Sequence, residues 1–260
     1  MNRLVALDLP GGQGFVDELQ RTWSNGDAVL PIDQRLPAAA KHQLCSRLGA
    51  MVVVDPNGER VTLDGGWNVE QGDALVVATS GSTGVPKGVV LTHDAVATSA
   101  AATSDRLGVN GADHWLACLP LSHVGGLSVV TRALHTGTRL TVHPSFNVDA
   151  VEHSGASLVS LVATAMRRVD SSLFRVIVLG GSRPPADRPP HVVTTYGMTE
   201  TGSGVVYDRR PLDGVELRIV DGELQLRCQM LLRCYRDDAD PLTPDGWYPT
   251  GDLGEIDSDG

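Results

Sequence analysis

Short apolar runs alternate along this chain with stretches of helical pattern. Runs rich in Val and Leu, and therefore predicted strands, lie at residues 51–54, 74–78, 115–119, 139–142, 158–162 and 175–179. Residues 94–107 and 126–134 have a helical pattern, and Gly108 and Gly137 are their expected ends. Strands that are apolar throughout need cover on both faces, so the pattern predicts an α/β fold of mixed sheets flanked by helices.

The pattern changes after residue 207. Residues 215–220 and 223–227 alternate apolar and polar positions around Asp221 and Gly222, which indicates a β-hairpin. We therefore expect an α/β region over residues 1–207 and a β-rich subdomain over residues 208–260. Whether residues 1–70 form a complete layer of the fold stays open at this point.

Composition narrows the class of protein. The 260 residues carry a formal net charge of −10, which argues against a nucleic-acid-binding face and against docking on anionic lipid. No apolar run reaches the length of a membrane span, and residues 1–14 do not match a cleavable signal pattern. The four cysteines have neither zinc-site nor disulfide-framework spacing, so reduced thiols in a cytoplasmic protein are expected.

One segment has the features of a phosphate-binding loop. After the run at 74–78, small residues lead to a single lysine in the order Thr79, Ser80, Gly81, Ser82, Thr83, Gly84, Val85, Pro86, Lys87. Glycines let the backbone approach a phosphate and successive N–H groups can bind an anion, while hydroxyls and Lys87 add donors and charge. Pro86 before the lysine and Gly88 after it depart from the Walker A pattern. A flexible turn is the weaker interpretation.

This segment resembles the signature loop of the adenylate-forming enzymes, which include acyl-CoA synthetases, adenylation domains and luciferases. In that superfamily the loop closes over the phosphates of ATP. Residues 120–127, 195–202 and 246–252 resemble three further motifs of the superfamily, in its order, and 180–182 resemble its glycine pair. Residues 26–37 resemble a less specific upstream motif. The resemblance implies the large lobe of the adenylate-forming fold.

The resemblance also implies a role for each matched residue. Thr79 to Gly84 and Lys87 would bind the phosphates of ATP, and Thr199 would reach the α-phosphate. A tyrosine can stack on a purine and Mg²⁺ prefers oxygen ligands, which agrees with Tyr196 on adenine and Glu200 at magnesium. Asp252 would accept the ribose hydroxyls. The rest of the adenine and ribose site would comprise Gly180, Gly181, Ser182, Thr195 and Gly197.

The acyl pocket is implied in the same way. Its expected residues are His123, Gly126, Leu127, Met198, Thr201 and Gly202. A single histidine after a strand is more often structural, so His123 takes its role from the motif alone. Together with Lys87, Thr199 and Glu200, it forms the expected catalytic set.

The reaction implied is the activation of a carboxylic acid by ATP, with magnesium, to an acyl-adenylate. A thiol, expected to be that of CoA, then takes the acyl group. In the family a small C-terminal lobe with a catalytic lysine follows the position of Gly260, so the 260 residues are expected to bind ATP and acid but to react slowly alone. Related enzymes often form homodimers, and the sequence identifies no interface.

The acid itself is suggested by a softer resemblance. The short N-terminal portion and residues 119–127, 196–202, 206–208 and 211–215 resemble the o-succinylbenzoate–CoA ligases of menaquinone biosynthesis. The second carboxylate of that acid would need a basic or hydroxyl partner. Arg132 is a candidate, although a surface position on its helix is the favoured interpretation. Another fatty or aryl acid–CoA ligase and a nucleotide-binding remnant without turnover remain the alternatives.

Overall fold

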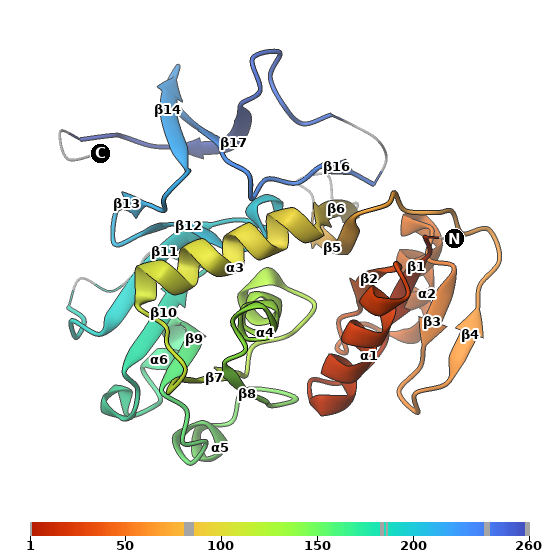
Figure 1. The fold of residues 1–260 in the computed structure, drawn as a ribbon, viewed down its shortest axis with the longest axis horizontal. Helices are drawn as coiled ribbons and strands as arrows, with labels where there is room; N and C mark the ends of the chain where they lie inside the picture. The colour runs from red at the N-terminus through yellow and green to blue at the C-terminus, as the bar shows by residue number, and fades with distance from the viewer. Residues whose placement is uncertain (1, 81–85, 183–184, 186, 237–239, 258–260) are drawn as a thin grey trace.

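The computed structural model describes residues 2–80, 86–182, 185, 187–236 and 240–257 (Figure 1). Within them, seven strands form a first sheet in the order β16 (Cys234–Tyr235), β6 (Pro86–Thr92), β5 (Asp73–Ser80), β2 (Ala28–Pro31), β1 (Leu4–Leu7), β3 (Val52–Val54) and β4 (Arg60–Thr62). Seven described strands form a second sheet in the order β13 (Arg210–Pro211), β12 (Gly204–Tyr207), β11 (Val192–Gly197), β10 (Val176–Gly180), β9 (Leu158–Val162), β7 (His114–Ala117) and β8 (Arg139–Val142). A third sheet comprises β14 (Glu216–Val220), β15 (Glu223–Arg227) and β17 (Tyr248–Leu253).

Helices cover both faces of the two large sheets. Helices α1 (Gln13–Ser24), α3 (His93–Leu107) and α4 (Val124–Thr136) pack on one face of the first sheet, and α3 and α4 also contact the second (Figure 1). Helix α2 (Ala38–Leu48) covers the opposite face of the first sheet. The outer face of the second sheet packs against α5 (Val148–Glu152), α6 (Ala163–Met166) and the 3₁₀ turn η1 (Ser171–Leu173) with its flanking residues.

This layering explains why the central strands are apolar throughout. In β1, Val5 and Leu7 join the core beneath α1, α3 and α4, whereas Leu4 and Ala6 join the core beneath α2. Successive side chains of a strand point to opposite faces, so a strand with helices on both sides has no position for a polar residue. The predicted α/β fold with flanked sheets is confirmed.

Several predicted elements are confirmed in detail. Helices α3 and α4 end at Gly108 and Gly137, whose φ angles of 59° and 65° are left-handed and favour glycine. Thr92 caps the start of α3 by accepting the N–H of Ala95 at 3.1 Å. The hairpin of β14 and β15 turns through Asp221 and Gly222, both with positive φ.

The C-terminal residues return to both large sheets. Strand β13 pairs with β12, and β16 pairs with β6 at the edge of the first sheet. The expected boundary at residue 207 therefore falls between two paired strands. Residues 4–62 supply four strands of the first sheet, β1 to β4, and the helices α1 and α2 that pack on its two faces. They therefore build a complete section of that layer.

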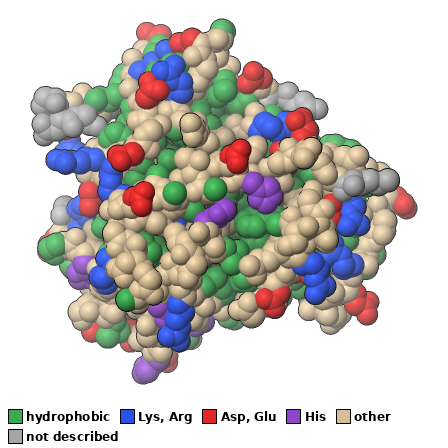
Figure 2. All heavy atoms as spheres, in the orientation of Figure 1, with side chains coloured by type: hydrophobic (Ala, Val, Ile, Leu, Met, Phe, Trp, Pro, Cys, Tyr) green, Lys and Arg blue, Asp and Glu red, His purple; other side chains and the backbone are tan. Residues whose placement is uncertain are grey.

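Ion pairs connect segments that are distant in sequence. On the face shown in Figure 2, Lys and Arg side chains lie in small groups beside Asp and Glu. Arg3 meets Asp27 at 2.7 Å, Arg233 meets Asp73 at 2.9 Å and Arg175 meets Asp113 at 2.6 Å. In each pair the carboxylate is buried, and the arginine satisfies it. No helix within the described ranges is both long and apolar enough to cross a bilayer.

Candidate active site

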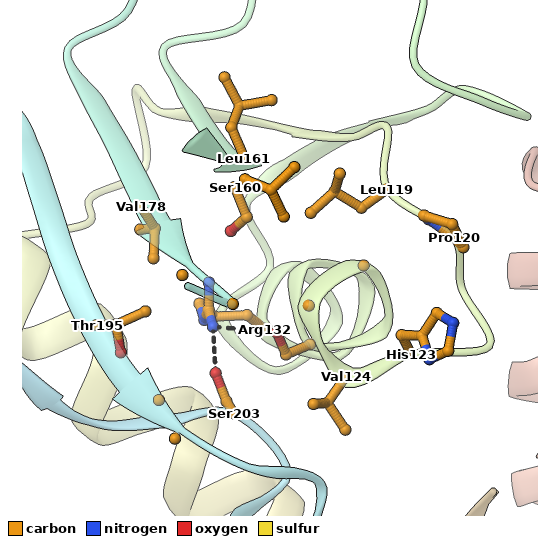
Figure 3. A pocket seen from close by; sticks show the side chains of 18 residues that line it. Leu119, Pro120, His123, Val124, Arg132, Ser160, Leu161, Val178, Thr195 and Ser203 are labelled. Carbon is orange, nitrogen blue, oxygen red and sulfur yellow. Dashed lines mark hydrogen bonds between the residues drawn. The ribbon is translucent and has the colours of Figure 1, made fainter. Parts of the chain in front are cut away.

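A cavity of 320 Å³ opens between α4 and the second sheet (Figure 3). Its walls come from the loop before α4, from α4 itself and from β9, β10, β11 and the start of β12. The lining residues are Leu119, Pro120, His123, Val124, Gly125, Gly126, Ser128, Arg132, Ser160, Leu161, Val162, Val178, Gly180, Gly181, Thr195, Gly197, Ser203 and Gly204. Such a mostly apolar recess with few polar groups has the character of a small-molecule site.

Arg132 is buried at the inner end of this cavity, so its expected surface position is wrong. Its side chain leaves α4 toward the second sheet and is only 2% exposed (Figure 3). Nη2 donates to Ser203 Oγ at 2.9 Å, and the guanidinium lies 4.9 Å from the ring centre of Trp115. Nε and Nη1 have no hydrogen-bond partner among the described residues. Burial lowers the pKa of Arg132, because the surroundings disfavour its charge.

Tyr196 and Asp252 meet on the far side of β11. The hydroxyl of Tyr196 donates to Asp252 Oδ2 at 2.7 Å, which joins the second sheet to β17. Burial and the bond to Asp252 raise the pKa of Tyr196, so the phenol stays protonated. Asp252 is exposed at the surface of the chain. The two residues expected at adenine and ribose therefore lie side by side.

Lys87 and Glu200 both contact a tyrosine that the sequence did not single out. Lys87, on β6, lies with Nζ 4.7 Å from the ring centre of Tyr235. The hydroxyl of Tyr235 donates to Glu200 Oε1 at 3.0 Å and lies 3.0 Å from the hydroxyl of Tyr248. Both Tyr235 and Tyr248 are buried. Thr199 and Glu200 lie on the 3₁₀ turn η2 (Thr199–Thr201).

His123 stands at the mouth of two recesses. It precedes α4 as its N-terminal cap residue, lines the cavity, and also lines a groove of 490 Å³ between α2 and β5. Arg35 Nη2 lies 3.3 Å from His123 Nε2. Arg35 also bonds to Asp33, and this hydrogen bond lowers the pKa of Asp33 to about 2. The expected acyl-pocket histidine thus lies between the cavity beside α4 and a second accessible space.

Some expected site residues lie elsewhere. Leu127 and Gly202 border a small void of 10 Å³ at the α3–α4 contact rather than the main cavity. Thr201 is fully buried, and its Oγ1 accepts the N–H of Met198 at 3.1 Å. Met198 is half-buried against the core. Gly81, Ser82, Thr83 and Gly84 lie outside the described residues.

Other expected residues border the site directly. Thr79 and Lys87 are register partners in the β5–β6 pair, and Ser80 pairs with Pro86 at its end. Gly180, Gly181, Thr195 and Gly197 line the cavity, and Ser182 is exposed next to them. At two of the glycines that line the cavity, neighbouring backbone leaves no room for a side chain. A Cβ at Gly126 would lie 2.4 Å from Leu119 O, and one at Gly197 would lie 2.2 Å from Ser203 O.

Magnesium fits this site only together with a phosphate ligand. Among the described residues, no group of three or more His, Cys, Asp or Glu side chains could hold a metal ion. Mg²⁺ is usually bound through one or two carboxylates together with substrate phosphates and water. Glu200 offers such a carboxylate, and it accepts a hydrogen bond from Tyr235, whose ring faces Lys87. The donor set therefore suits an ion that arrives with a nucleotide.

Comparison with known proteins defines the class of this fold and site. The AMP-binding enzyme family matches residues 68–227. A probable 2-succinylbenzoate–CoA ligase of Mycobacterium tuberculosis (strain CDC 1551 / Oshkosh) is 34% identical over 97% of this chain and 68% of its own length. The chain therefore belongs to the AMP-binding enzymes. Within that family its relatives include the 2-succinylbenzoate–CoA ligases of Mycobacterium tuberculosis and of Bacillus cytotoxicus, the latter 34% identical.

Solved structures agree with the expected fold. Wild-type E. coli MenE with a bound m-phenylether-linked analogue of OSB-AMS has a TM-score of 0.83 and 25% identity, over 99% of this chain and 65% of that one. MenE from Bacillus subtilis in complex with the acyl-adenylate intermediate OSB-AMP has a TM-score of 0.85 at 23% identity. The chain spans about two thirds of the mycobacterial relative and 48% of the Bacillus cytotoxicus one. The resemblance to the adenylate-forming enzymes is confirmed.

Proposed function

We propose that these residues bind ATP and an aryl dicarboxylic acid, as the adenylating part of a 2-succinylbenzoate–CoA ligase. The buried guanidinium of Arg132 carries this proposal. A cation 2% exposed, with two nitrogens unpartnered among the described residues, is unfavourable unless another group supplies acceptors. A carboxylate on the ligand would supply the missing acceptors and could bind the planar fork at two points.

The acid would span the cavity from Arg132 to His123. In that orientation one carboxylate meets the guanidinium at the inner end, and the other reaches the mouth, near the residues expected to hold ATP. The volume of 320 Å³ lies within the range of small-molecule sites, roughly 300–1,000 Å³. Ser203 and Ser128 flank Arg132 and keep its guanidinium in place at 2.9 and 3.4 Å.

The chemistry would then proceed in two steps. A carboxylate oxygen attacks the α-phosphorus of ATP, the bond from that phosphorus to the bridging oxygen breaks, and pyrophosphate leaves. A thiol, that of CoA, next attacks the acyl carbon and releases AMP. Lys87 would hold the departing pyrophosphate, Asp252 the ribose and Tyr196 the adenine. Magnesium, held through Glu200, would neutralise phosphate charge. Positioning and charge neutralisation supply most of the rate in such reactions.

Two alternatives make different demands on the cavity. A fatty acid–CoA ligase would need an apolar inner end, where this chain places Arg132 and two serines. A nucleotide-binding remnant would not need a closed acid cavity at all. Both are therefore less well supported than a dicarboxylate ligase.

Isothermal titration of the 260-residue chain with Mg-ATP, and then with o-succinylbenzoate, tests this proposal. Binding of both ligands is expected, and Asp252→Asn should weaken Mg-ATP without affecting the acid. Lys87→Ala should weaken Mg-ATP more than AMP, because AMP lacks the phosphates that Lys87 would contact. Binding of Mg-ATP without the acid would refute the substrate, and binding of neither would leave the remnant interpretation.

A further inference from the structure

Tyr235 occupies the position between two opposite charges of the site. Its ring faces the ammonium of Lys87 at 4.7 Å, and its hydroxyl donates to Glu200 at 3.0 Å. No salt bridge within the described part of the chain joins Lys87 to Glu200. The side chain is 9% exposed, and its strand β16 is paired with β6, so it is anchored beside Lys87.

This arrangement keeps both charges available for a ligand. Lys87 is exposed and Glu200 is half-buried, so water would screen a direct pair between them, but that pair would still have to break before either could bind another group. A contact between an ammonium and an aromatic face contributes only about 0.5–2 kcal/mol and uses none of the nitrogen's three hydrogens. Lys87 is therefore held in place, and because no described residue accepts a hydrogen bond from its ammonium, those donors can serve a phosphate.

The tyrosine also connects the two ends of the nucleotide site. Its hydroxyl lies 3.0 Å from that of Tyr248, the first residue of β17. Asp252, on the same strand, accepts the hydroxyl of Tyr196. A chain of hydrogen bonds and one short strand thus runs from Glu200 to Asp252. The spacing between the expected phosphate and ribose contacts depends on this connection.

We propose that Tyr235 is a positioning residue for the triphosphate of Mg-ATP, holding Lys87 and Glu200 apart and in fixed orientation. The proposal rests on the function proposed above. It assigns no chemical step to the tyrosine. The side chain acts through its neighbours, so its removal should affect ligands in proportion to the phosphates they carry.

The test compares Mg-ATP with AMP on the 260-residue chain by isothermal titration. Tyr235→Phe keeps the ring above Lys87 but removes the donor to Glu200. A hydrogen bond to a charged group contributes enough to change an equilibrium roughly tenfold or more. Tyr235→Phe should therefore weaken Mg-ATP by about tenfold and AMP by less than about twofold. Tyr235→Leu, which also removes the ring, should weaken Mg-ATP further.

Tyr207→Phe is the matched control. Tyr207 is also buried, at 2% exposed against 9% for Tyr235, and its hydroxyl lies 3.2 Å from Thr103 Oγ1 rather than at Lys87 or Glu200. It should lower the melting temperature by a similar amount while leaving the ratio of the Mg-ATP and AMP dissociation constants unchanged. Equal ratios in Tyr235→Phe and Tyr207→Phe, with the wild-type chain binding both nucleotides, would overturn the positioning role alone. A wild-type chain that binds neither nucleotide would overturn the proposed function as well.

Discussion

Replacing Arg132 by methionine should uncouple ligand recognition from stability. Methionine fills a similar volume, but it has neither the charge nor the five donors of arginine. If the guanidinium binds the second carboxylate of o-succinylbenzoate, the substitution removes a hydrogen bond between charged groups, worth about 1.5–3 kcal/mol. The dissociation constant for the dicarboxylate should then rise roughly 10- to 150-fold. The matched ligand is 4-oxo-4-phenylbutanoate, which lacks the ring carboxylate and should bind the wild-type and variant chains almost equally.

Stability without ligand should change little. The substitution removes the 2.9 Å bond to Ser203 and the contact with the Trp115 ring, together worth about 1–3 kcal/mol. It also removes a buried cation, two of whose nitrogens have no partner among the described residues, and burying such groups costs about 1–3 kcal/mol. Because the two contributions oppose each other, the free energy of unfolding should change by less than about 2 kcal/mol. For a chain of this size the melting temperature should move by at most about 8 °C.

Titration calorimetry with both acids and a thermal melt provide the assay. The wild-type chain should prefer the dicarboxylate, and the variant should bind both acids with similar affinity. Two results would refute the reasoning. If Arg132→Met keeps the preference, another group binds the second carboxylate. If it unfolds the chain, with a loss of more than about 4 kcal/mol, the arginine is a structural residue and its unpartnered nitrogens do not indicate a ligand.

Two further predictions concern stability. Burial alone would raise the pKa of Asp113, but hydrogen bonds led by Arg175 outweigh it and hold this pKa below its ordinary value of 3.8. The ion pair therefore stabilises the fold above about pH 4, and this stabilisation is lost as the pH falls through the folded pKa. Asp113→Asn should be less stable by about 1–3 kcal/mol at pH 7. In denaturant titrations its stability should also depend less on pH below about pH 4. An equal pH dependence in both chains would contradict this. Gly125 and Gly126 are adjacent on α4, yet a Cβ at Gly125 meets only a side chain at 3.7 Å, whereas one at Gly126 meets backbone oxygens at 2.4 and 2.5 Å. Gly125→Ala should raise the free energy of unfolding by up to about 1 kcal/mol, and Gly126→Ala should lower it; urea unfolding that gave the same sign for both would refute the steric argument.

The periodic elements of this fold could be predicted from the sequence because their signals are local. The stops at Gly108 and Gly137 and the turn at Asp221 and Gly222 each follow from the backbone conformation that glycine and aspartate tolerate. The apolar strands are similarly visible, because burial on both faces excludes polar residues over several positions in a row. These features do not depend on which segments meet in space.

Contacts between segments that are distant in sequence could not be predicted in this way. Strand β16 has two residues, too few for any period, and only its pairing with β6 places Tyr235 beside Lys87. Arg132 was misjudged because a charged residue on a helix is usually exposed. Its helix is buried between two sheets, so even this arginine packs against the protein interior. A signal was present in its neighbours, since the residues before it are almost all apolar or small, a pattern that leaves no polar face.

The charges of this chain differ in whether the protein itself neutralises them. Arg3, Arg175 and Arg233 each meet a buried carboxylate, which is the arrangement expected where a charge supports the fold. Among the described residues Arg132 meets two hydroxyls and a ring, and the exposed Lys87 meets a tyrosine ring. A protein selected for stability alone would gain by pairing or removing the buried Arg132, so its presence indicates a site where a ligand completes the pairing. The buried cation at the cavity between α4 and the second sheet thus indicates an anionic group on the ligand, whereas the role of the exposed Lys87 at phosphate stays a prediction.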